Sequence, residues 1–245
     1  MKEICAIIPA RYKSKRLPGK PLIKLFNKEL LLLTYEKIKK IISEEDIYVF
    51  TDSMKVKNKL DKKIKNIVLF KGKFNNGTER AAFGLKYIKK SYKATMLISC
   101  DNPFIKESSI KKCIEAYRVI KNNNIYCGST IHTKNNKLNI YKNKNIAKIV
   151  LDKKNDVMYL SRSPIPYNYE KNRYYLTHHG PVCLKINNLK MYYKLQNTPL
   201  QIAEDNEWLK MLEYGFKIRS SLVNSINREI NTVDDLKYYQ NKLNK

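Results

Sequence analysis

The feature that most constrains the fold of this chain is an alternation of short apolar runs with helical patterns through its first half. Runs rich in β-branched residues occupy residues 4–9, 47–51, 67–70, 96–100, 125–131, 146–151 and, more weakly, 216–222. Between the early runs, apolar residues recur at spacings of three and four residues, in 31–42 and again in 110–117. Strands that alternate with amphipathic helices predict an α/β fold with a mostly parallel, Rossmann-like sheet covered on both faces.

The second half of the chain departs from this alternation. Residues 134–145 are rich in Lys and Asn, which predicts a solvated loop, and residues 161–166 form a turn rich in Ser and Pro. A chain of 245 residues is long enough for one large domain or for a core with a smaller lobe. We therefore expect a single domain over residues 1–245 with an inserted smaller lobe at residues 133–190, which could also be a subunit contact.

Helical patterns return near the end of the chain. Apolar residues are spaced as in a helix over 200–214. Thr232 and Asp235 form the T-x-x-D capping pattern, which predicts a final helix that begins at Val233.

The charge of the chain raises the question of a nucleic-acid partner. Lys and Arg together number 49 against 22 Asp and Glu, a formal net charge of +27. Nearly all of this charge is Lys, whereas Arg is the residue best suited to bidentate recognition of bases and phosphates. The pattern favours a general drift in surface composition, so we expect no nucleic-acid partner, although a nucleic-acid-binding protein stays the alternative from a different class.

Cysteine spacing and hydropathy indicate the compartment. The five cysteines are widely spaced and form no C-x-x-C pair, which argues against a disulfide framework and a zinc site. No apolar stretch approaches the length of a membrane span, and the apolar run at residues 4–8 is too short for a signal peptide. We expect a cytoplasmic protein without a membrane partner.

The loop after the first predicted strand is the strongest candidate for a binding site. Residues 9–22 read P-A-R-Y-K-S-K-R-L-P-G-K-P-L, a basic segment stiffened by prolines. Ligands of open parallel sheets bind at the carboxyl ends of the strands, where such a loop could present cations and backbone N–H groups to a polyphosphate. The segment contains neither a P-loop nor a dinucleotide-binding pattern. Its residues alone leave open an exposed basic turn in a Lys-rich protein.

This string resembles the characteristic loop of the CMP-sugar-acid synthetases, and most of all that of the 3-deoxy-manno-octulosonate cytidylyltransferases. The resemblance implies a nucleotidyltransferase sheet and a CTP-binding loop. It implies that Arg11 and Lys20 hold the triphosphate, that Arg16 helps to hold the loop, and that Ala10 and Ser14 also contact the nucleotide.

A second block, N-G-T-E-R at residues 76–80, follows the third predicted strand and resembles the S-G-T-E-R segment that lies against the nucleotide base in this family. Gly77 permits a close approach of the backbone, and Thr78 is suited to cap a helix. Arg80 could reach an anionic or carbonyl group. Without the resemblance, the segment would be an ordinary start of a helix.

Candidate metal ligands come from two further segments. Asp101 follows the predicted strand at 96–100, and a carboxylate there could bind Mg²⁺ together with phosphate oxygens, although a lone acid could also form a turn. By resemblance to a V-D-T-x-x-D-L string, the second ligand of the family falls on Asn231. The amide carbonyl could coordinate the ion without adding charge, and Glu229 could replace it as a ligand.

The predicted lobe supplies the residues that the resemblance assigns to a sugar acid. Arg162 could pair with the sugar carboxylate, and His178 could bond a hydroxyl. Glu204 could bind sugar hydroxyls or be surface charge on a helix. Several positions depart from the family pattern around these motifs: Ser99, Cys100, Asn102, Thr177, Gln201 and Trp208, the last of which fits a buried aromatic residue.

We therefore expect attack by the anomeric hydroxyl of a 3-deoxy-ulosonic acid on the α-phosphorus of CTP, with release of pyrophosphate. Arg11, Lys20 and an ion held by Asp101 would supply positioning and charge neutralisation. The family implies a homodimer. The alternatives are a synthetase for a sialic-like or amino-substituted acid and an inactive nucleotide-binding relative.

Overall fold

The structure is a computed structural model of the whole chain, and residues 2–13, 17–167, 169, 174–224 and 229–243 are described. The chain divides into two compact units. The first unit comprises Met1–Ile110 and Asn227–Lys245, and the second comprises Lys111–Ile226. The predicted boundaries of the inserted lobe, 133–190, stay a prediction.

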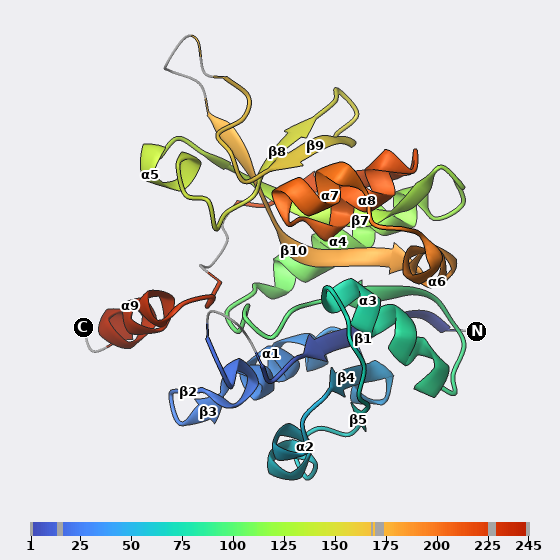
Figure 1. The fold of residues 1–245 in the computed structure, drawn as a ribbon, viewed down its shortest axis with the longest axis vertical. Coiled ribbons are helices and arrows are strands. Elements are labelled where there is room, and N and C mark those ends of the chain that lie inside the picture. The colour runs from blue at the N-terminus through green and yellow to red at the C-terminus, as the bar shows by residue number, and fades with distance from the viewer. Residues whose placement is uncertain (1, 14–16, 168, 170–173, 225–228, 244–245) are drawn as a thin grey trace. The chain divides into compact units, whose positions relative to one another are not determined.

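The sheet of the first unit is parallel. It contains β1 (Lys2–Ala10), β4 (Ile47–Thr51), β5 (Ile67–Leu69) and β6 (Tyr92–Leu97) in the spatial order β6-β1-β4-β5. Figure 1 labels β1, β4 and β5 of this sheet. β4 is buried along its whole length, β6 along nearly all of it, and β1 along its middle, as expected of central strands covered on both faces. Ala10 pairs with Thr51, so β1 and β4 end side by side and their carboxyl ends share one edge.

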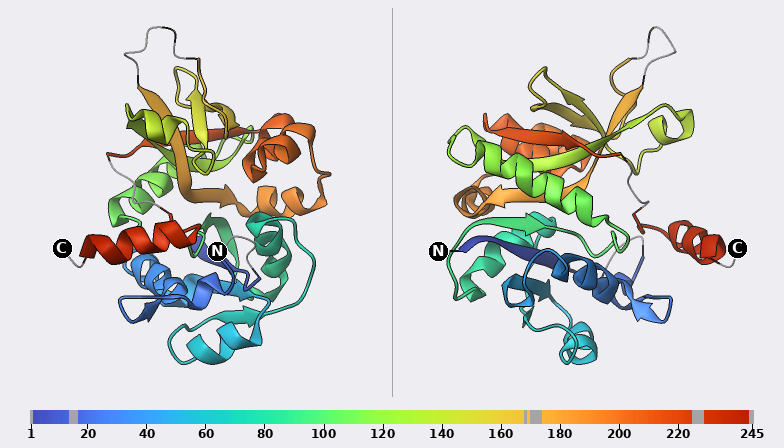
Figure 2. Two further views of the ribbon diagram at one scale, coloured as in Figure 1. Left: turned by 60° about the vertical axis from the view of Figure 1, so that its left-hand side comes forward. Right: turned by 180° about the vertical axis from the view of Figure 1, so that it is seen from behind.

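The first unit also contains helices, short 3₁₀ segments and a hairpin. They are η1 (Lys20–Leu22), the hairpin of β2 (Lys24–Leu25) and β3 (Lys28–Glu29), α1 (Leu30–Lys39), η2 (Glu44–Asp46), α2 (Met54–Leu60), α3 (Gly77–Gly84), η3 (Leu85–Tyr87) and α9 (Val233–Leu243). Figure 2 shows α9 beside the hairpin and α1. There Ile230 and Tyr239 join Leu17, Leu25 and Leu30 in one apolar cluster. The cluster anchors the segment that carries Glu229 and Asn231.

The second unit contains a mixed sheet. Its strands are β7 (Tyr126–Asn135), β8 (Lys148–Leu151), β9 (Val157–Ser161), β10 (Tyr175–Lys185) and β11 (Lys217–Leu222). β7 pairs with β11 in parallel, whereas the pairs β7–β10, β10–β8 and β8–β9 are antiparallel. Its helices are most of α4 (Glu107–Ile120), α5 (Leu138–Tyr141), α6 (Ile186–Lys194), α7 (Pro199–Glu204) and α8 (Glu207–Glu213).

Several predicted elements are confirmed. The α/β class with a mostly parallel sheet holds, the strand at 47–51 has its predicted bounds, and the last helix begins at Val233. The side chain of Asp235 accepts hydrogen bonds from Thr232 N and Oγ1, each at 2.8 Å. The predicted capping box therefore forms.

Three predictions of local structure are wrong in part. Residues 134–145 are not all a solvated loop, because β7 continues to Asn135 and α5 buries Tyr141, which stacks on Tyr175. The strand expected at 96–100 ends at Leu97. The helical pattern at 200–214 is two helices, because Asp205 adopts a left-handed conformation with φ 45°.

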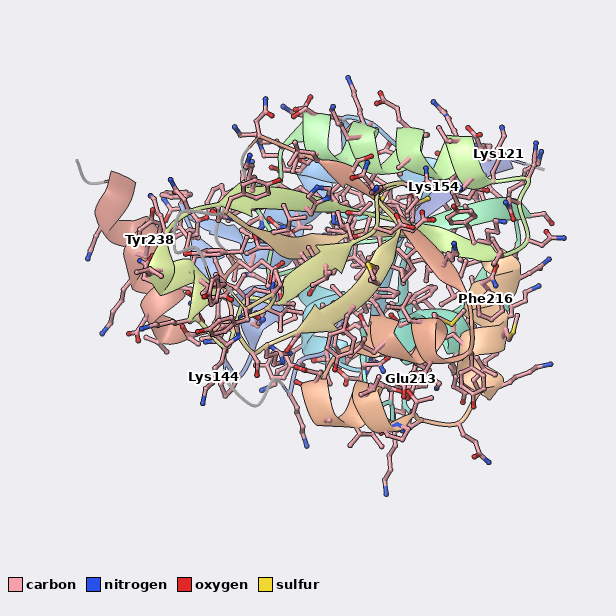
Figure 3. All side chains as sticks on the ribbon, turned by 90° about the horizontal axis from the view of Figure 1, so that it is seen from above. Lys121, Lys144, Lys154, Glu213, Phe216 and Tyr238 are labelled. Carbon is pink, nitrogen blue, oxygen red and sulfur yellow. The ribbon has the colours of Figure 1, made fainter. Side chains whose placement is uncertain are left out.

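The surface carries the excess of lysine that the composition indicates. Figure 3 shows nitrogen-tipped side chains directed outward, with Lys121 and Lys144 labelled near the edges of the view. Within the part of the chain that the structure describes, no helix is long and apolar enough to cross a membrane.

Candidate active site

The centre of the candidate site is the side chain of Lys20. Its ammonium lies 3.1 Å from Asp101 Oδ2 and 3.0 Å from Asn231 Oδ1. The Lys20 side chain is 10% exposed and that of Asp101 is 13% exposed, so the ion pair is shielded from bulk water. Three segments far apart in the sequence, predicted separately as phosphate-binding and metal-binding, thus meet at one cation.

Local structure explains why these groups converge. Lys20 begins η1 after Gly19, which adopts φ 71°, a conformation that favours glycine. The N–H of Ile230 donates to the carbonyl of Asp101 at 2.8 Å, which ties the approach to α9 to the loop after β6. The carbonyl and carboxylate of Asp101 therefore hold two different parts of the same site.

Both the oxygen and the nitrogen of the Asn231 side-chain amide form hydrogen bonds. Its Oδ1 accepts from Lys20, and its Nδ2 donates to Glu229 Oε2 at 3.2 Å. Its backbone N–H donates to Asp235 Oδ2 at 2.9 Å. The structure thus brings the three candidate metal ligands, Asp101, Asn231 and Glu229, into one hydrogen-bonded chain.

A second group of charges joins β4, the loop after β1 and α3. Arg80 Nη2 donates to Asp52 Oδ2 at 3.0 Å, and Asp52 Oδ1 accepts from Tyr12 N at 3.1 Å. The side chain of Arg80 is only 3% exposed. Burial lowers the pKa of its guanidinium, the Asp52 carboxylate opposes that shift, and the positive charge of Arg11 adds to it. The side chain of Arg11 is exposed.

The start of α3 differs in one detail from the prediction. The N-cap is Asn76, whose side chain accepts from Glu79 N at 2.8 Å, whereas Thr78 is buried within the first turn. Asparagine is preferred over threonine at the N-cap, which explains why the cap lies two residues before Thr78. Gly77 lies against Pro9, and a Cβ at this position would be 3.1 Å from the proline ring. Gly77 therefore lets the backbone pack closely on Pro9, and its predicted contact with the nucleotide stays a prediction.

Two predicted nucleotide contacts, Ser14 and Arg16, lie outside the described residues. Ala10 is buried at the end of β1, next to the exposed Arg11. The roles assigned to these residues stay predictions.

In the second unit, Arg162 and Glu204 contact each other through several groups. Glu204 Oε2 accepts from Arg162 N at 2.8 Å, and Glu204 Oε1 accepts from Ser161 Oγ at 2.6 Å. The Arg162 guanidinium donates to the Glu204 carbonyl at 2.8 Å and to the Asp205 carbonyl at 2.9 Å. These bonds join the end of β9 to the end of α7, and sugar binding by either side chain stays a prediction.

The three histidines of the chain gather on β7 and β10. His178 pairs with His132 across the two strands, and His179 follows. Each ring contacts a hydroxyl: His178 Nε2 lies 2.9 Å from Thr130 Oγ1, His179 Nε2 2.9 Å from Thr177 Oγ1, and His132 Nδ1 2.7 Å from Ser220 Oγ. Burial lowers the pKa of His132 and His178 to about 4 and that of His179 to about 3, and neighbouring imidazoles add to the last two shifts. The rings are therefore neutral at pH 7.

Two of the positions that depart from the family motif, Thr177 and Gln201, form side-chain hydrogen bonds within the fold. Thr177 shares hydrogen bonds with Thr133 Oγ1 and Asn135 Nδ2, each at 2.8 Å. Gln201 forms a capping box with Thr198, and Trp208 is buried as expected. Asn102 is buried as well.

Sequence reasoning missed Asp52, although it follows a predicted strand as Asp101 does. The rule that ligands bind at the carboxyl ends of parallel strands applies to both residues. Asp52 lies in none of the motifs that carry the family resemblance, so the sequence did not mark it as a site residue.

Lys20, Asp101 and Asn231 thus lie together beyond the carboxyl ends of a parallel α/β sheet, where such folds bind ligands. The chain belongs to the cytidylyltransferase family, whose model matches residues 5–218.

Within this family, the chain is similar in sequence to proteins with a named activity. The chain is 32% identical over 240 residues to a 3-deoxy-manno-octulosonate cytidylyltransferase of Protochlamydia amoebophila, covering 96% of this chain and 92% of the relative. It is also 32% identical over 257 residues to the protein of that name from Thermodesulfovibrio yellowstonii, covering 100% of this chain and 99% of the relative.

Solved structures share the fold. A CMP:2-keto-3-deoxy-manno-octonic acid synthetase complexed with CTP matches with a TM-score of 0.88 at 23% identity, over 99% of both chains. A 4-diphosphocytidyl-2C-methyl-D-erythritol synthase from Anaerococcus prevotii matches with a TM-score of 0.65 at 16% identity, over 100% of this chain and 97% of that one. The expected fold is therefore confirmed.

Proposed function

We propose that this protein is a cytidylyltransferase that joins CTP to a 3-deoxy-ulosonic acid, 3-deoxy-manno-octulosonate or a close analogue, and releases pyrophosphate. The observation that carries the proposal is the convergence of Lys20, Asp101 and Asn231 at the carboxyl edge of the sheet. Relatives that bear this activity in their names align with nearly the whole chain.

The reaction requires little covalent chemistry from the protein. The anomeric hydroxyl of the sugar acid forms a bond to the α-phosphorus of CTP, the bond from that phosphorus to the bridging oxygen breaks, and pyrophosphate leaves. The hydroxyl proton passes to solvent or to a phosphate oxygen. Arg11 and Lys20 would bind the triphosphate and neutralise its charge, which favours the transition state over the separate reactants.

The residues around Lys20 fit a Mg²⁺ ion. Asp101 and Asn231 already direct oxygen atoms at one cation, the Lys20 ammonium, and the Glu229 carboxylate lies next to Asn231. No cluster of three or more His, Cys, Asp or Glu side chains suited to a metal occurs among the described residues. Mg²⁺ does not require such a cluster, because one or two carboxylates and phosphate oxygens usually hold it. Such an ion would supply charge neutralisation at the phosphates.

We also infer a homodimer formed through the lobe, as the family resemblance implies. Tyr167 is 87% exposed, Tyr169 86% and Met158 62%, so large apolar side chains lie on the surface of this part of the second unit. Light scattering behind a sizing column tests this point, and a mass of one chain would contradict it.

A cytoplasmic location fits the cysteines. All five, Cys5, Cys100, Cys113, Cys127 and Cys183, are buried free thiols. Burial raises the pKa of four of them to about 12, so they are unreactive in this environment.

The test of the activity is pyrophosphate release with Mg²⁺, CTP and 3-deoxy-manno-octulosonate, followed by a panel of other sugar acids. Turnover with 3-deoxy-manno-octulosonate is the expected result. Turnover only with a sialic-like or amino-substituted acid would assign that acid as the substrate in place of 3-deoxy-manno-octulosonate. No turnover with any acid, in a protein whose melting temperature CTP still raises, would indicate a binding relative without activity.

Asp101→Ala provides the matched test of the site. The variant should lose turnover and keep its fold, because the carboxylate is at the edge of the sheet and outside its core. Asp61→Ala removes an exposed aspartate that follows α2 and should keep full activity. Activity of Asp101→Ala at the wild-type level would contradict the assignment.

A further inference from the structure

The end of β4 holds the backbone on both sides of Arg11. Thr51 Oγ1 donates to the carbonyl of Ala10 at 2.9 Å, and the Asp52 carboxylate accepts from the N–H of Tyr12 at 3.1 Å. The carbonyl of Tyr12 in turn accepts from Gly19 N at 3.0 Å. Two adjacent side chains of one strand end thus fix the peptide groups before and after Arg11, while the arginine side chain stays exposed.

The second oxygen of the same carboxylate holds α3. Asp52 Oδ2 accepts from Arg80 Nη2 at 3.0 Å. The Arg80 guanidinium carbon lies 5.0 Å from the centroid of the Phe74 ring, and its Nη1 is buried without a hydrogen-bond partner among the residues that the structure describes. The Arg80 guanidinium carbon also lies 5.9 Å from the centroid of the Phe70 ring. A buried guanidinium between aromatic rings depends on its carboxylate for orientation and for charge compensation.

Without Asp52, the positive charges of Arg11 and Arg80 would lose a negative charge that compensates them. The positive charge of Arg11 acts unfavourably on the charged form of Arg80, and Asp52 acts favourably on it. A triphosphate would need both arginines charged and correctly placed. The Asp52 carboxylate therefore keeps Arg80 charged and in place before the nucleotide binds.

We propose that Asp52 is the positioning residue of the CTP site, because its single carboxylate fixes both the turn that carries Arg11 and the guanidinium of Arg80. The inference depends on the proposed use of CTP. Its benefit is preorganisation: the loop and the arginine are ordered before binding, so the nucleotide does not bear that entropic cost.

The test is Asp52→Asn, which keeps the size of the side chain and removes its charge. One amide atom can still accept from Tyr12 N–H, but the other is a donor that faces the donor of Arg80. We expect the dissociation constant for CTP, measured by calorimetry without sugar acid, to rise about tenfold, the size of one lost charge-assisted hydrogen bond. The KM for CTP should rise with it, while the KM for the sugar acid stays unchanged.

The matched control is Asp46→Asn, at the opposite end of the same strand. The Asp46 carboxylate accepts from Lys2 Nζ and from Tyr92 Oη, each at 2.7 Å, and lies at the amino end of β4. This variant should lose stability and keep the wild-type affinity for CTP. A loss of CTP affinity equal to that of Asp52→Asn would show a general structural effect and overturn the inference.

Thr51→Val and Asp52→Glu keep the inference testable if Asp52→Asn does not fold. Thr51→Val removes only the hydroxyl that holds Ala10 and should weaken CTP binding, and Asp52→Glu should restore part of the lost affinity because it restores the charge. Wild-type affinity for CTP in Asp52→Asn, or in Thr51→Val when Asp52→Asn is unfolded, would overturn the role of this strand end. Failure of the wild-type protein to bind CTP would instead overturn the proposed function.

Discussion

Asn231 satisfies two neighbours of opposite charge with one amide. Its carbonyl oxygen faces the Lys20 ammonium, and its NH₂ group faces the Glu229 carboxylate. An aspartate here would keep the first contact and oppose the second, because two carboxylates at this separation repel each other. The neutral Asn231 side chain is thus compatible with a carboxylate at Glu229. Together the two side chains carry one negative charge, whereas an aspartate at position 231 would raise this to two.

This charge balance predicts the behaviour of Asn231→Asp. In the absence of metal the variant should melt at a lower temperature than the wild type, and Mg²⁺ should raise its melting temperature more than it raises that of the wild type. The reason is that an added carboxylate increases both the repulsion of the empty site and its attraction for a divalent cation. Thermal melting across a Mg²⁺ series without substrates measures both effects.

Asn58→Asp adds the same charge on an exposed position of α2 and serves as the control. Equal Mg²⁺ responses of the two variants would show that the added charge acts without a local site.

At this scale the motifs singled out residues that the folded chain places together. Lys20, Asp101 and Asn231 lay in separate recognisable strings, and the structure brings them together. Asp52 could not be recognised in the same way, because its importance depends on two partners, Tyr12 and Arg80, that only the folded chain brings near.

Among the elements, β8 contains a buried cation that its sequence did not suggest. The Lys148 side chain is fully buried, and its ammonium donates to the carbonyls of Asn143 at 3.0 Å, Ile146 at 2.7 Å and Arg162 at 2.5 Å. Burial, and to a smaller extent the charge of Arg162, lowers the pKa of Lys148 to about 8. One lysine therefore fixes the segment before β8 to the segment after β9.

Replacing Lys148 tests this connection. Lys148→Met fills similar space but leaves three carbonyl groups without their donor, so we expect the free energy of unfolding to fall by about 2 kcal/mol or more. Urea unfolding followed by circular dichroism measures the loss. Lys154→Met, at an exposed lysine of the same unit, should change stability little, and similar losses in both variants would contradict the role of the carbonyl contacts.

The sequence predicted elements best where the pattern was local and strong. The strand at 47–51 and the capped helix from Val233 have the expected bounds. The prediction of a solvated loop at 134–145 was wrong in part because it rested on the many lysines and asparagines there. The segment also contains Tyr141, which stacks on Tyr175. Such a contact between distant residues leaves no trace in local composition.

For the molecule as a whole, the three histidines form a pH-sensitive group. Their pKa values are lowered to about 4, 4 and 3, so the folded protein resists their protonation. The unfolded chain takes up protons near pH 6.5, which means that it binds more protons than the folded chain between that pH and about 4. Stability contributed by the neutral rings is present above pH 6.5 and is lost as the pH falls.

We therefore expect the free energy of unfolding to decrease between pH 7 and pH 5, by up to about 1.4 kcal/mol per pH unit for each histidine. Urea titrations at several pH values measure the slope. His178→Gln keeps a polar group near Thr130 and does not titrate, so its slope should be smaller by about one proton. A slope equal to that of the wild type would show that His178 is not part of the effect.

The order of the chain has a consequence for synthesis on the ribosome. The cluster that contains Leu17, Leu25 and Leu30 is completed by Ile230 and Tyr239, which emerge only after the whole second unit has been translated. The nascent chain can form β1, β4 and β6 early, but Glu229 and Asn231 are added after residues 111–226. During translation the growing polypeptide thus contains Lys20 and Asp101 long before it contains the partners that complete their site.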